Sequence, residues 1–125
     1  MDKVLLVFIG GGLGSLARFG TAVLSARWFG TSFPWGTAIV NLAGCFLIGL
    51  VYGIAERTSW IGPGARLFVM TGFLGGLTTF SAFAVESVAA GRQSGAGALL
   101  LNVLINNVGG LALAAAGILA AKWVR

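Results

Sequence analysis

Charged side chains divide this sequence into long apolar runs. Residues 28–55, 67–85 and 93–121 hold no charged side chain, which gives runs of 28, 19 and 29 residues. A shorter run covers residues 4–17. Because a helix needs about 20 mostly apolar residues to cross a bilayer, each long run can span one. We therefore predict transmembrane helices near residues 4–26, 33–55, 65–90 and 95–122.

Aromatic and helix-breaking residues mark the ends of these predicted helices. An amphipathic ring is most stable at the membrane–water interface, and all the tryptophans fall there: Trp28, Trp35, Trp60 and Trp123. Pro34 is expected near the first helical position of the second helix, where proline costs no hydrogen bond. Gly62-Pro63-Gly64 separates the second helix from the third.

The composition excludes an ordinary soluble domain. Of 125 residues, 58% are apolar, and 8 basic plus 3 acidic side chains give only 11 charges. Charged residues make up about 25% of a soluble domain. Four spans use roughly 80 residues. We therefore expect residues 1–125 to form a single all-α transmembrane domain with short loops. We expect its first helix to be a transmembrane span and not a cleaved signal peptide.

The same composition argues against an enzyme. The chain has no His and one Cys, and its only acids are Asp2, Glu56 and Glu86. The usual catalytic triads and transition-metal sites cannot be built from this set within one chain. No cluster of Lys and Arg is dense enough to indicate nucleic-acid binding.

The basic residues favour one end of the predicted bundle. Four helices place both termini on one side, and that side carries Lys3, Arg57, Arg66, Lys122 and Arg125. The other side carries Arg27 and Arg92. Positive charges remain on the cytoplasmic side, so the bias of five to two favours cytoplasmic termini.

Glycines recur at the spacing that lets helices approach closely. Gly10/Gly14, Gly49/Gly53 and Gly72/Gly76 are GxxxG pairs, and such pairs line helix interfaces in membranes. We interpret the first two pairs as helix-packing positions.

Polar side chains inside the spans are the informative positions. Thr37 and Asn41 share a face of the second helix, and Asn102 and Asn106 share a face of the fourth. Such groups either pair with one another or line a path across the membrane. For a single pair we favour interhelical hydrogen bonds worth about 1 kcal/mol or less; two stripes together favour a path.

The third predicted helix contains a weak point, Gly72-Phe73-Leu74-Gly75-Gly76-Leu77-Thr78-Thr79-Phe80-Ser81-Ala82-Phe83. Glycine costs about 1 kcal/mol against alanine in a helix, and threonine is also unfavourable. We expect a break at mid-membrane, and free carbonyls there could hold a small cation. Phe80 and Phe83 follow at helical spacing, and the positive edges of their rings could contact a small anion.

These motifs resemble the small fluoride channels called Fluc or CrcB. The resemblance covers nearly the whole chain and rests on GGLGSLAR at 11–18, FPWGT at 33–37, VNLAG at 40–44 and, most specifically, GFLGGLTTFSAF at 72–83. It implies an antiparallel (dual-topology) homodimer in lipid with two fluoride pores. Such a dimer should carry almost no charge bias, so antiparallel assembly is expected from the resemblance and not from the count of five to two.

The resemblance also implies roles for individual residues. Phe80 and Phe83 match the phenylalanine pair of the pore, Asn41 matches its amide donor, and Thr37 and Ser81 match neighbouring polar lining. The carbonyls of Gly75 and Thr78 correspond to a structural Na⁺ site, and Arg18 to a vestibule arginine or, alternatively, to an arginine that reaches for the interface.

Four positions leave the assignment of roles open. Ala82 stands where the family often has a hydroxyl, and Asn102 and Asn106 stand where Tyr or Ser is common. We expect both asparagines to contribute to the polar lining. Glu86 matches a family glutamate and equally suits a charge at a helix end.

From these residues we expect a passive channel that exports fluoride across the bacterial inner membrane. The alternatives are a small proton-coupled multidrug exporter and a structural subunit of a membrane complex. An exporter needs a carboxylate within the membrane. The first helix offers Arg18 instead, and Glu86 lies near a helix end, so the sequence disfavours the exporter.

Overall fold

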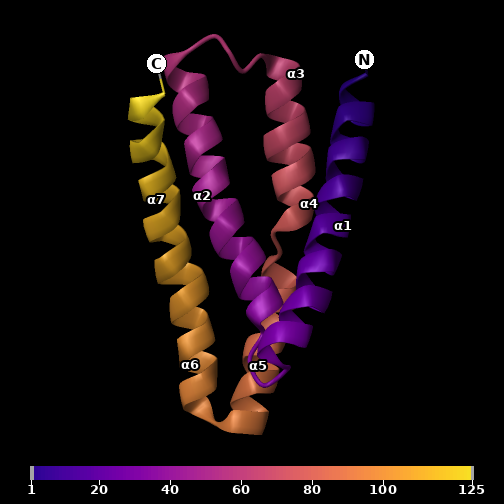
Figure 1. The fold of residues 1–125 in the computed structure, drawn as a ribbon, viewed down its shortest axis with the longest axis vertical. Helices are drawn as coiled ribbons and strands as arrows, with labels where there is room; N and C mark the ends of the chain where they lie inside the picture. Colours follow the sequence, from indigo (N-terminus) through magenta and orange to yellow (C-terminus); the bar gives the residue numbers. More distant parts are fainter. Residues whose placement is uncertain (1, 125) are drawn as a thin grey trace.

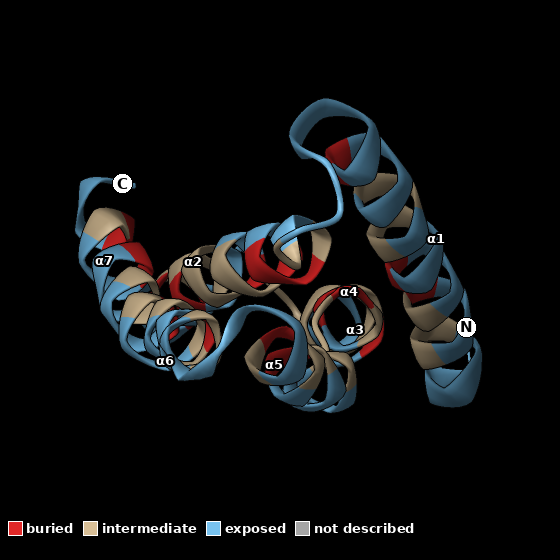
Figure 2. Ribbon diagram, turned by 90° about the horizontal axis from the view of Figure 1, so that it is seen from below, coloured by how far each residue is buried: buried red, intermediate tan, exposed pale blue. Residues whose placement is uncertain are grey.

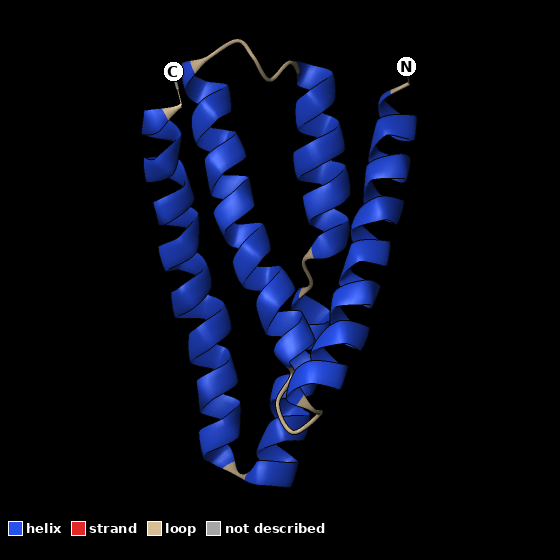
Figure 3. Ribbon diagram, in the orientation of Figure 1, coloured by secondary structure: helices blue, strands red, loops and turns tan. Residues whose placement is uncertain are grey.

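The chain forms a bundle of four long helical segments that run alternately up and down (Figure 1). The computed structural model describes residues 2–124, and within them no strand is present (Figure 3). The spans are α1 (Lys3–Phe29), α2 (Trp35–Arg57), Pro63–Ser94 and Ala96–Trp123. All four are long and apolar enough to cross a membrane. The expected all-α architecture is confirmed.

The third and fourth spans are not regular along their length. The third consists of α3 (Pro63–Arg66), the π-helix η1 (Leu67–Leu74), α4 (Gly75–Leu77) and α5 (Phe80–Ser94). The fourth consists of α6 (Ala96–Leu104), the π-helix η2 (Ile105–Gly109), α7 (Gly110–Ala120) and the 3₁₀ turn η3 (Ala121–Trp123). π-Turns often accompany functional sites.

Between α4 and α5 the backbone leaves the helical conformation. Thr78 has φ −83° and ψ 156°, and Thr79 has φ −154° and ψ 128°, both extended. Figure 3 draws this connection as a loop between two blue helices. Two consecutive extended residues remove the helical hydrogen bonds there, so side chains must satisfy the freed groups.

The helix ends follow from local chemistry. The Asp2 side chain caps α1 by accepting a hydrogen bond from the Val4 N–H (3.2 Å). Gly30 and Gly95 end α1 and α5 with positive φ values of 76° and 88°, which glycine adopts without strain. Pro34 lies at the N-cap of α2 instead of inside its first turn. Pro34 therefore lies directly before the first helical residue, Trp35, close to the expected position.

Both termini and the loop between α2 and α3 lie at one end of the bundle (Figure 1). The basic residues Lys3, Arg57, Arg66 and Lys122 therefore gather there, whereas Arg27 and Arg92 lie at the helix ends opposite. Arg125 lies outside the described residues. The predicted division of charges between the two ends is confirmed for the described part of the chain.

Glycines make the closest helix contacts. A Cβ atom on Gly14 would overlap the Phe73 carbonyl oxygen, and one on Gly76 would overlap the Gly11 carbonyl oxygen, so α1 lies directly against η1 and α4. A Cβ atom on Gly49 would likewise overlap the Ala114 carbonyl oxygen of α7. The interpretation of the GxxxG pairs as packing positions is confirmed, and it extends to Gly72/Gly76.

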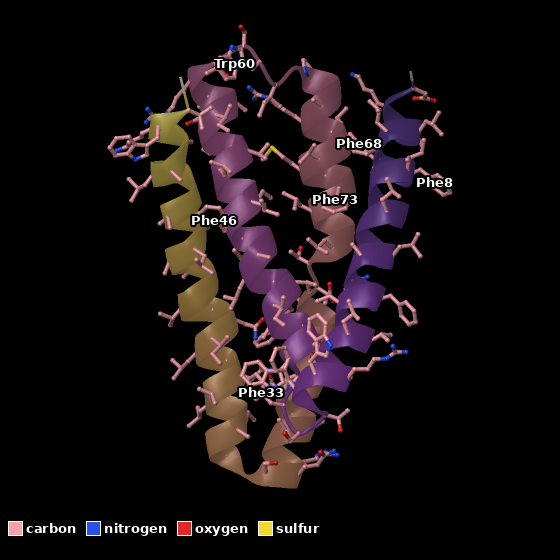
Figure 4. The ribbon with its side chains drawn as sticks, viewed as in Figure 1. Phe8, Phe33, Phe46, Trp60, Phe68 and Phe73 are labelled. Carbon is pink, nitrogen blue, oxygen red and sulfur yellow. The ribbon has the colours of Figure 1, made fainter. Side chains whose placement is uncertain are left out.

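Few residues are buried in this single chain (Figure 2). Many of the exposed side chains are large and apolar. One apolar cluster of Val40, Leu74 and Leu77 lies where α2 meets the third span, next to the interruption. Phe8 is 76% exposed and points away from the bundle (Figure 4). Such faces need lipid or another protein surface to cover them.

The packing of α1 gives a direct prediction. Gly14→Ala should lower the free energy of unfolding by about 1–3 kcal/mol, because the new methyl group must displace backbone of the third span. Gly20→Ala is the matched control, since a Cβ atom on Gly20 meets nothing within 4 Å. Thermal unfolding of the detergent-solubilised protein measures both variants; equal midpoints would contradict the proposed packing.

Candidate functional site

The extended residues of the third span are held by the side chain of Asn41. The Thr79 N–H donates to Asn41 Oδ1 (2.8 Å), and Asn41 Nδ2 donates to the Thr79 carbonyl (3.1 Å). One side-chain amide thus satisfies both backbone polar groups of Thr79, as a neighbouring strand would. A Cβ atom on Gly44, one turn further along α2, would overlap the Thr78 methyl group, so glycine permits this close approach.

The threonine hydroxyls complete the two helix ends. Thr78 Oγ1 donates to the Leu74 carbonyl (2.9 Å) at the end of α4. Thr79 Oγ1 accepts from the Ala82 N–H (3.3 Å) and so caps α5, and it lies 3.4 Å from the hydroxyl of Ser81. Hydroxyl caps of this kind replace the water that a membrane interior lacks.

The polar stripes of the second and fourth spans meet here. Asn41 Nδ2 also donates to Asn106 Oδ1 (2.9 Å). Asn106 Nδ2 donates to Asn102 Oδ1 (2.9 Å) and to the Asn102 carbonyl (3.0 Å). Asn102 Nδ2 donates to Ser87 Oγ (2.9 Å), and Ser87 Oγ donates to the Phe83 carbonyl (2.7 Å). The two stripes therefore pair with each other across three spans.

A cavity of about 380 Å³ opens at the interruption. Its lining includes Asn41, Thr79, Phe80, Phe83, Asn106 and Asn107. The rings of Phe80 and Phe83 lie 5.4 Å apart at an interplanar angle of 57°. Phe83 is 6% exposed, whereas Phe80 is 75% exposed. Five of the residues expected from the sequence thus line one space: Asn41, Thr78, Phe80, Phe83 and Asn106.

Other expected residues lie elsewhere. Asn102 has no exposed surface and lines neither described cavity. Ser81 is exposed beside Thr79. Thr37 is buried and lines a second cavity of about 270 Å³ between α1, α2 and α5, together with Glu86 and Gln93. One Glu86 carboxylate oxygen, Oε2, is buried there and has no hydrogen-bond partner among the described residues.

Asn107 is a residue of this site that the sequence pattern did not reveal. It lies in the π-helix η2 next to Asn106, and both line the larger cavity. Its Nδ2 donates to the Val103 carbonyl (2.9 Å), which leaves its second N–H free of that bond. Neighbouring residues diverge on a regular α-helix. In the sequence, the Gly109-Gly110 pair that follows shortly after Asn107 was the one feature that could have indicated an irregular turn here.

Two backbone carbonyls at the interruption bear on cation binding. In a continuous helix the Thr79 N–H would donate to the Gly75 carbonyl, but it donates to Asn41 instead. The Thr78 carbonyl accepts from Arg18 Nη1 at 3.4 Å, so this carbonyl already faces a cationic group. No group of three His, Cys, Asp or Glu that could hold a metal exists within residues 2–124. The oxygens present at the interruption are those of the backbone, the threonine hydroxyls and the asparagine amides.

The larger cavity therefore combines amides, hydroxyls and aromatic rings, and none of its lining residues is ionisable except Cys45. Neutral donors and ring edges can replace part of the water around a small anion. A site of this composition can bind and release an ion, but it lacks an acid, a base and an activated nucleophile.

Comparison with known proteins agrees with this chemistry. A family described as "CrcB-like protein, Camphor Resistance (CrcB)" matches residues 5–118. A protein of Salinibacter ruber named "Fluoride-specific ion channel FluC" is 46% identical over 118 residues, covering 94% of this chain and 87% of its own. A protein of the same name from a Geobacter species is 43% identical over 125 residues and covers 98% of both chains. The chain therefore belongs to the CrcB family.

Proposed function

We propose that this protein is a fluoride-selective channel that lets fluoride leave the bacterial cytoplasm down its gradient. The observation that carries the proposal is the cavity at Thr78 and Thr79, where amides, hydroxyls and two phenylalanine rings surround one space. It occurs in a multi-pass membrane protein whose relatives, 39–46% identical over most of its length, are named fluoride-specific ion channels.

Neutral groups suit the passage of fluoride. Fluoride is strongly hydrated, so a pore must offer hydrogen-bond donors at short range, yet a full positive charge would hold the ion and slow its exit. The Ser81 hydroxyl and the second N–H of Asn107 supply donors beside the Asn41 and Asn106 amides. The edges of Phe80 and Phe83 supply partial positive charge. Thr37 lies on the same face of α2 and continues the polar path toward the second cavity.

The pore is completed by a second copy in the opposite orientation. Several observations support this part of the proposal. Phe80 is 75% exposed beside the cavity. In α1, only 11% of the most apolar 18-residue stretch is buried. A partner surface would cover these groups and close the open side of the cavity. An antiparallel pair then contains two equivalent paths, one built around each copy of the phenylalanine pair.

A structural Na⁺ at the centre of this dimer fits the residues present. The carbonyls of Gly75 and Thr78 would hold it, joined by the same carbonyls of the second copy. Support comes from the Gly75 carbonyl, whose helical donor is engaged by Asn41, and from the negative end of the short helix α4. Bound there, the ion would supply fixed positive charge between the two paths. The Arg18 guanidinium, which donates to the Thr78 carbonyl in this single chain, would then turn away from that oxygen toward the vestibule.

The phenylalanine pair provides the first functional test. Phe80→Ile and Phe83→Ile should each reduce fluoride efflux from proteoliposomes about tenfold or more, equivalent to ~1.4 kcal/mol added to the barrier. The reason is that a branched aliphatic side chain fills space but has no positive edge. A fluoride electrode measures efflux, and size-exclusion chromatography shows that the variants remain dimeric. Leu111→Ile, at a 76% exposed position of α7 outside both cavities, is the control and should conduct normally.

Unchanged efflux in both pore variants would remove the ring pair from the mechanism. Efflux by the unmodified protein no faster than from empty liposomes, or equal chloride flux, would contradict the channel function itself.

Antiparallel assembly is tested by labelling in intact cells. In the Cys45→Ser background, Ser59→Cys introduces a single thiol into the exposed loop between α2 and α3. A membrane-impermeant maleimide should modify roughly half of the molecules, since each orientation presents this loop on a different side. The same chain labelled after membrane permeabilisation gives the full signal. Complete labelling or none in intact cells would show a single orientation.

A further inference from the structure

The side-chain hydrogen bonds at the site form one chain that runs in a single direction. It begins at the Thr79 N–H and passes through the side chains of Asn41, Asn106, Asn102 and Ser87. It ends at the Phe83 carbonyl, one turn before Ser87 on α5. The chain thus links the interruption of the third span to the backbone of the buried phenylalanine.

Backbone groups fix the direction of every bond. The Thr79 N–H can only donate and the Thr79 carbonyl can only accept, so Asn41 must place its oxygen on the first and its nitrogen on the second. Asn41 Nδ2 then requires an acceptor from Asn106. The Asn106 nitrogen faces the Asn102 carbonyl, which can only accept. None of the three asparagine amides in this series of hydrogen bonds can be flipped by 180° without placing two donors or two acceptors face to face.

The same bonds use up most of the donors. Both N–H bonds of Asn41 are engaged, with the Thr79 carbonyl and Asn106 Oδ1. Both N–H bonds of Asn106 are engaged, with the carbonyl and Oδ1 of Asn102. Asn102 is 0% exposed and Ser87 is 4% exposed. Neither of these last two side chains reaches the cavity, so neither can touch a passing ion.

We propose that Asn102 and Ser87 are positioning residues for conduction: they hold the Asn106 amide and the Phe83 backbone in place without contacting the anion. This inference rests on the proposed fluoride channel. Asn102 Oδ1 keeps one Asn106 N–H engaged, and Asn102 Nδ2 holds the Ser87 hydroxyl, which in turn donates to the Phe83 carbonyl. Bonds aligned in one direction also polarise one another and so strengthen the whole chain.

Loss of Asn102 therefore has a specific consequence. Without its oxygen, one Asn106 N–H becomes a free donor at the edge of the cavity. A free donor binds fluoride more tightly and slows its exit, because conduction requires binding that is weak enough to release the ion. Loss of the Ser87 hydroxyl leaves Asn102 Nδ2 unpaired in a buried position, which loosens the same chain from its other end.

The test is a double-mutant cycle on flux. Asn102→Leu and Ser87→Ala should each reduce fluoride efflux per reconstituted dimer about tenfold, and the double variant should lose little more than either single variant, because both act through one chain. Thr21→Val is the matched control: Thr21 Oγ1 also donates to a carbonyl one turn back on its own helix, Ala17, but it lies in neither cavity. This variant should conduct normally.

A second readout separates positioning from a merely structural role. Efflux is compared at several internal fluoride concentrations, and tighter binding should make the Asn102→Leu rate saturate at lower fluoride than the unmodified protein. Additive losses in the double variant, normal efflux in both single variants, or loss of stability with an unchanged saturation curve would overturn the inference. If the unmodified protein carries no fluoride, the proposed function fails instead. If Asn102→Leu does not fold, the smaller substitution Ser87→Ala still tests the inference through its own effect on fluoride efflux.

Discussion

The structure depends on satisfying two residues of extended backbone where the third span should be helical. In a membrane no water is available to hydrogen bond such groups, and each one left unpaired costs several kcal/mol. Asn41 resolves this for Thr79 by pairing with both its N–H and its carbonyl. Everything else at the site is arranged around that pairing, including the glycine that lets α2 approach and the asparagines of the fourth span that orient the amide.

This solution explains why an ion path can exist in a chain with so few charges. Side chains that stabilise irregular backbone must themselves be polar, so the interruption brings neutral donors together at one depth of the bundle. The cavity lies beside them, at the non-helical connection between α4 and α5 (Figure 1). The donors engaged in the series of amides hold the site in place, while the Ser81 hydroxyl and one N–H of Asn107 stay outside that series.

Much of the fold could be predicted from the sequence, because it follows from local properties. Charge-free runs gave the four spans, and GxxxG spacing identified the surfaces that pack. The Gly75-Gly76 and Thr78-Thr79 pairs marked the position where the structure has extended residues. Helix ends were off by a few residues: α1 continues to Phe29 and α5 to Ser94, since the glycines that end them lie beyond the last charged side chains.

The site was less predictable because it depends on contacts between distant residues. Asn102 and Asn106 lie on one helix face, but only their partners decide which of them reaches a cavity. Asn102 turns toward Ser87, 15 residues away in sequence, and is fully buried. Asn107 reaches the cavity through a π-turn that helical periodicity cannot reveal. Thr37 and Asn41 share a face of α2, yet they line different cavities.

The central claim is that neutral donors and phenylalanine edges at this interruption pass fluoride and reject larger halides. The most direct measurement is the reversal potential of the purified protein in a planar bilayer with opposed fluoride and chloride gradients. The account predicts a current that reverses at the fluoride equilibrium potential and does not move when chloride is exchanged for an impermeant anion. A reversal potential that follows chloride, or the absence of any current, would contradict it.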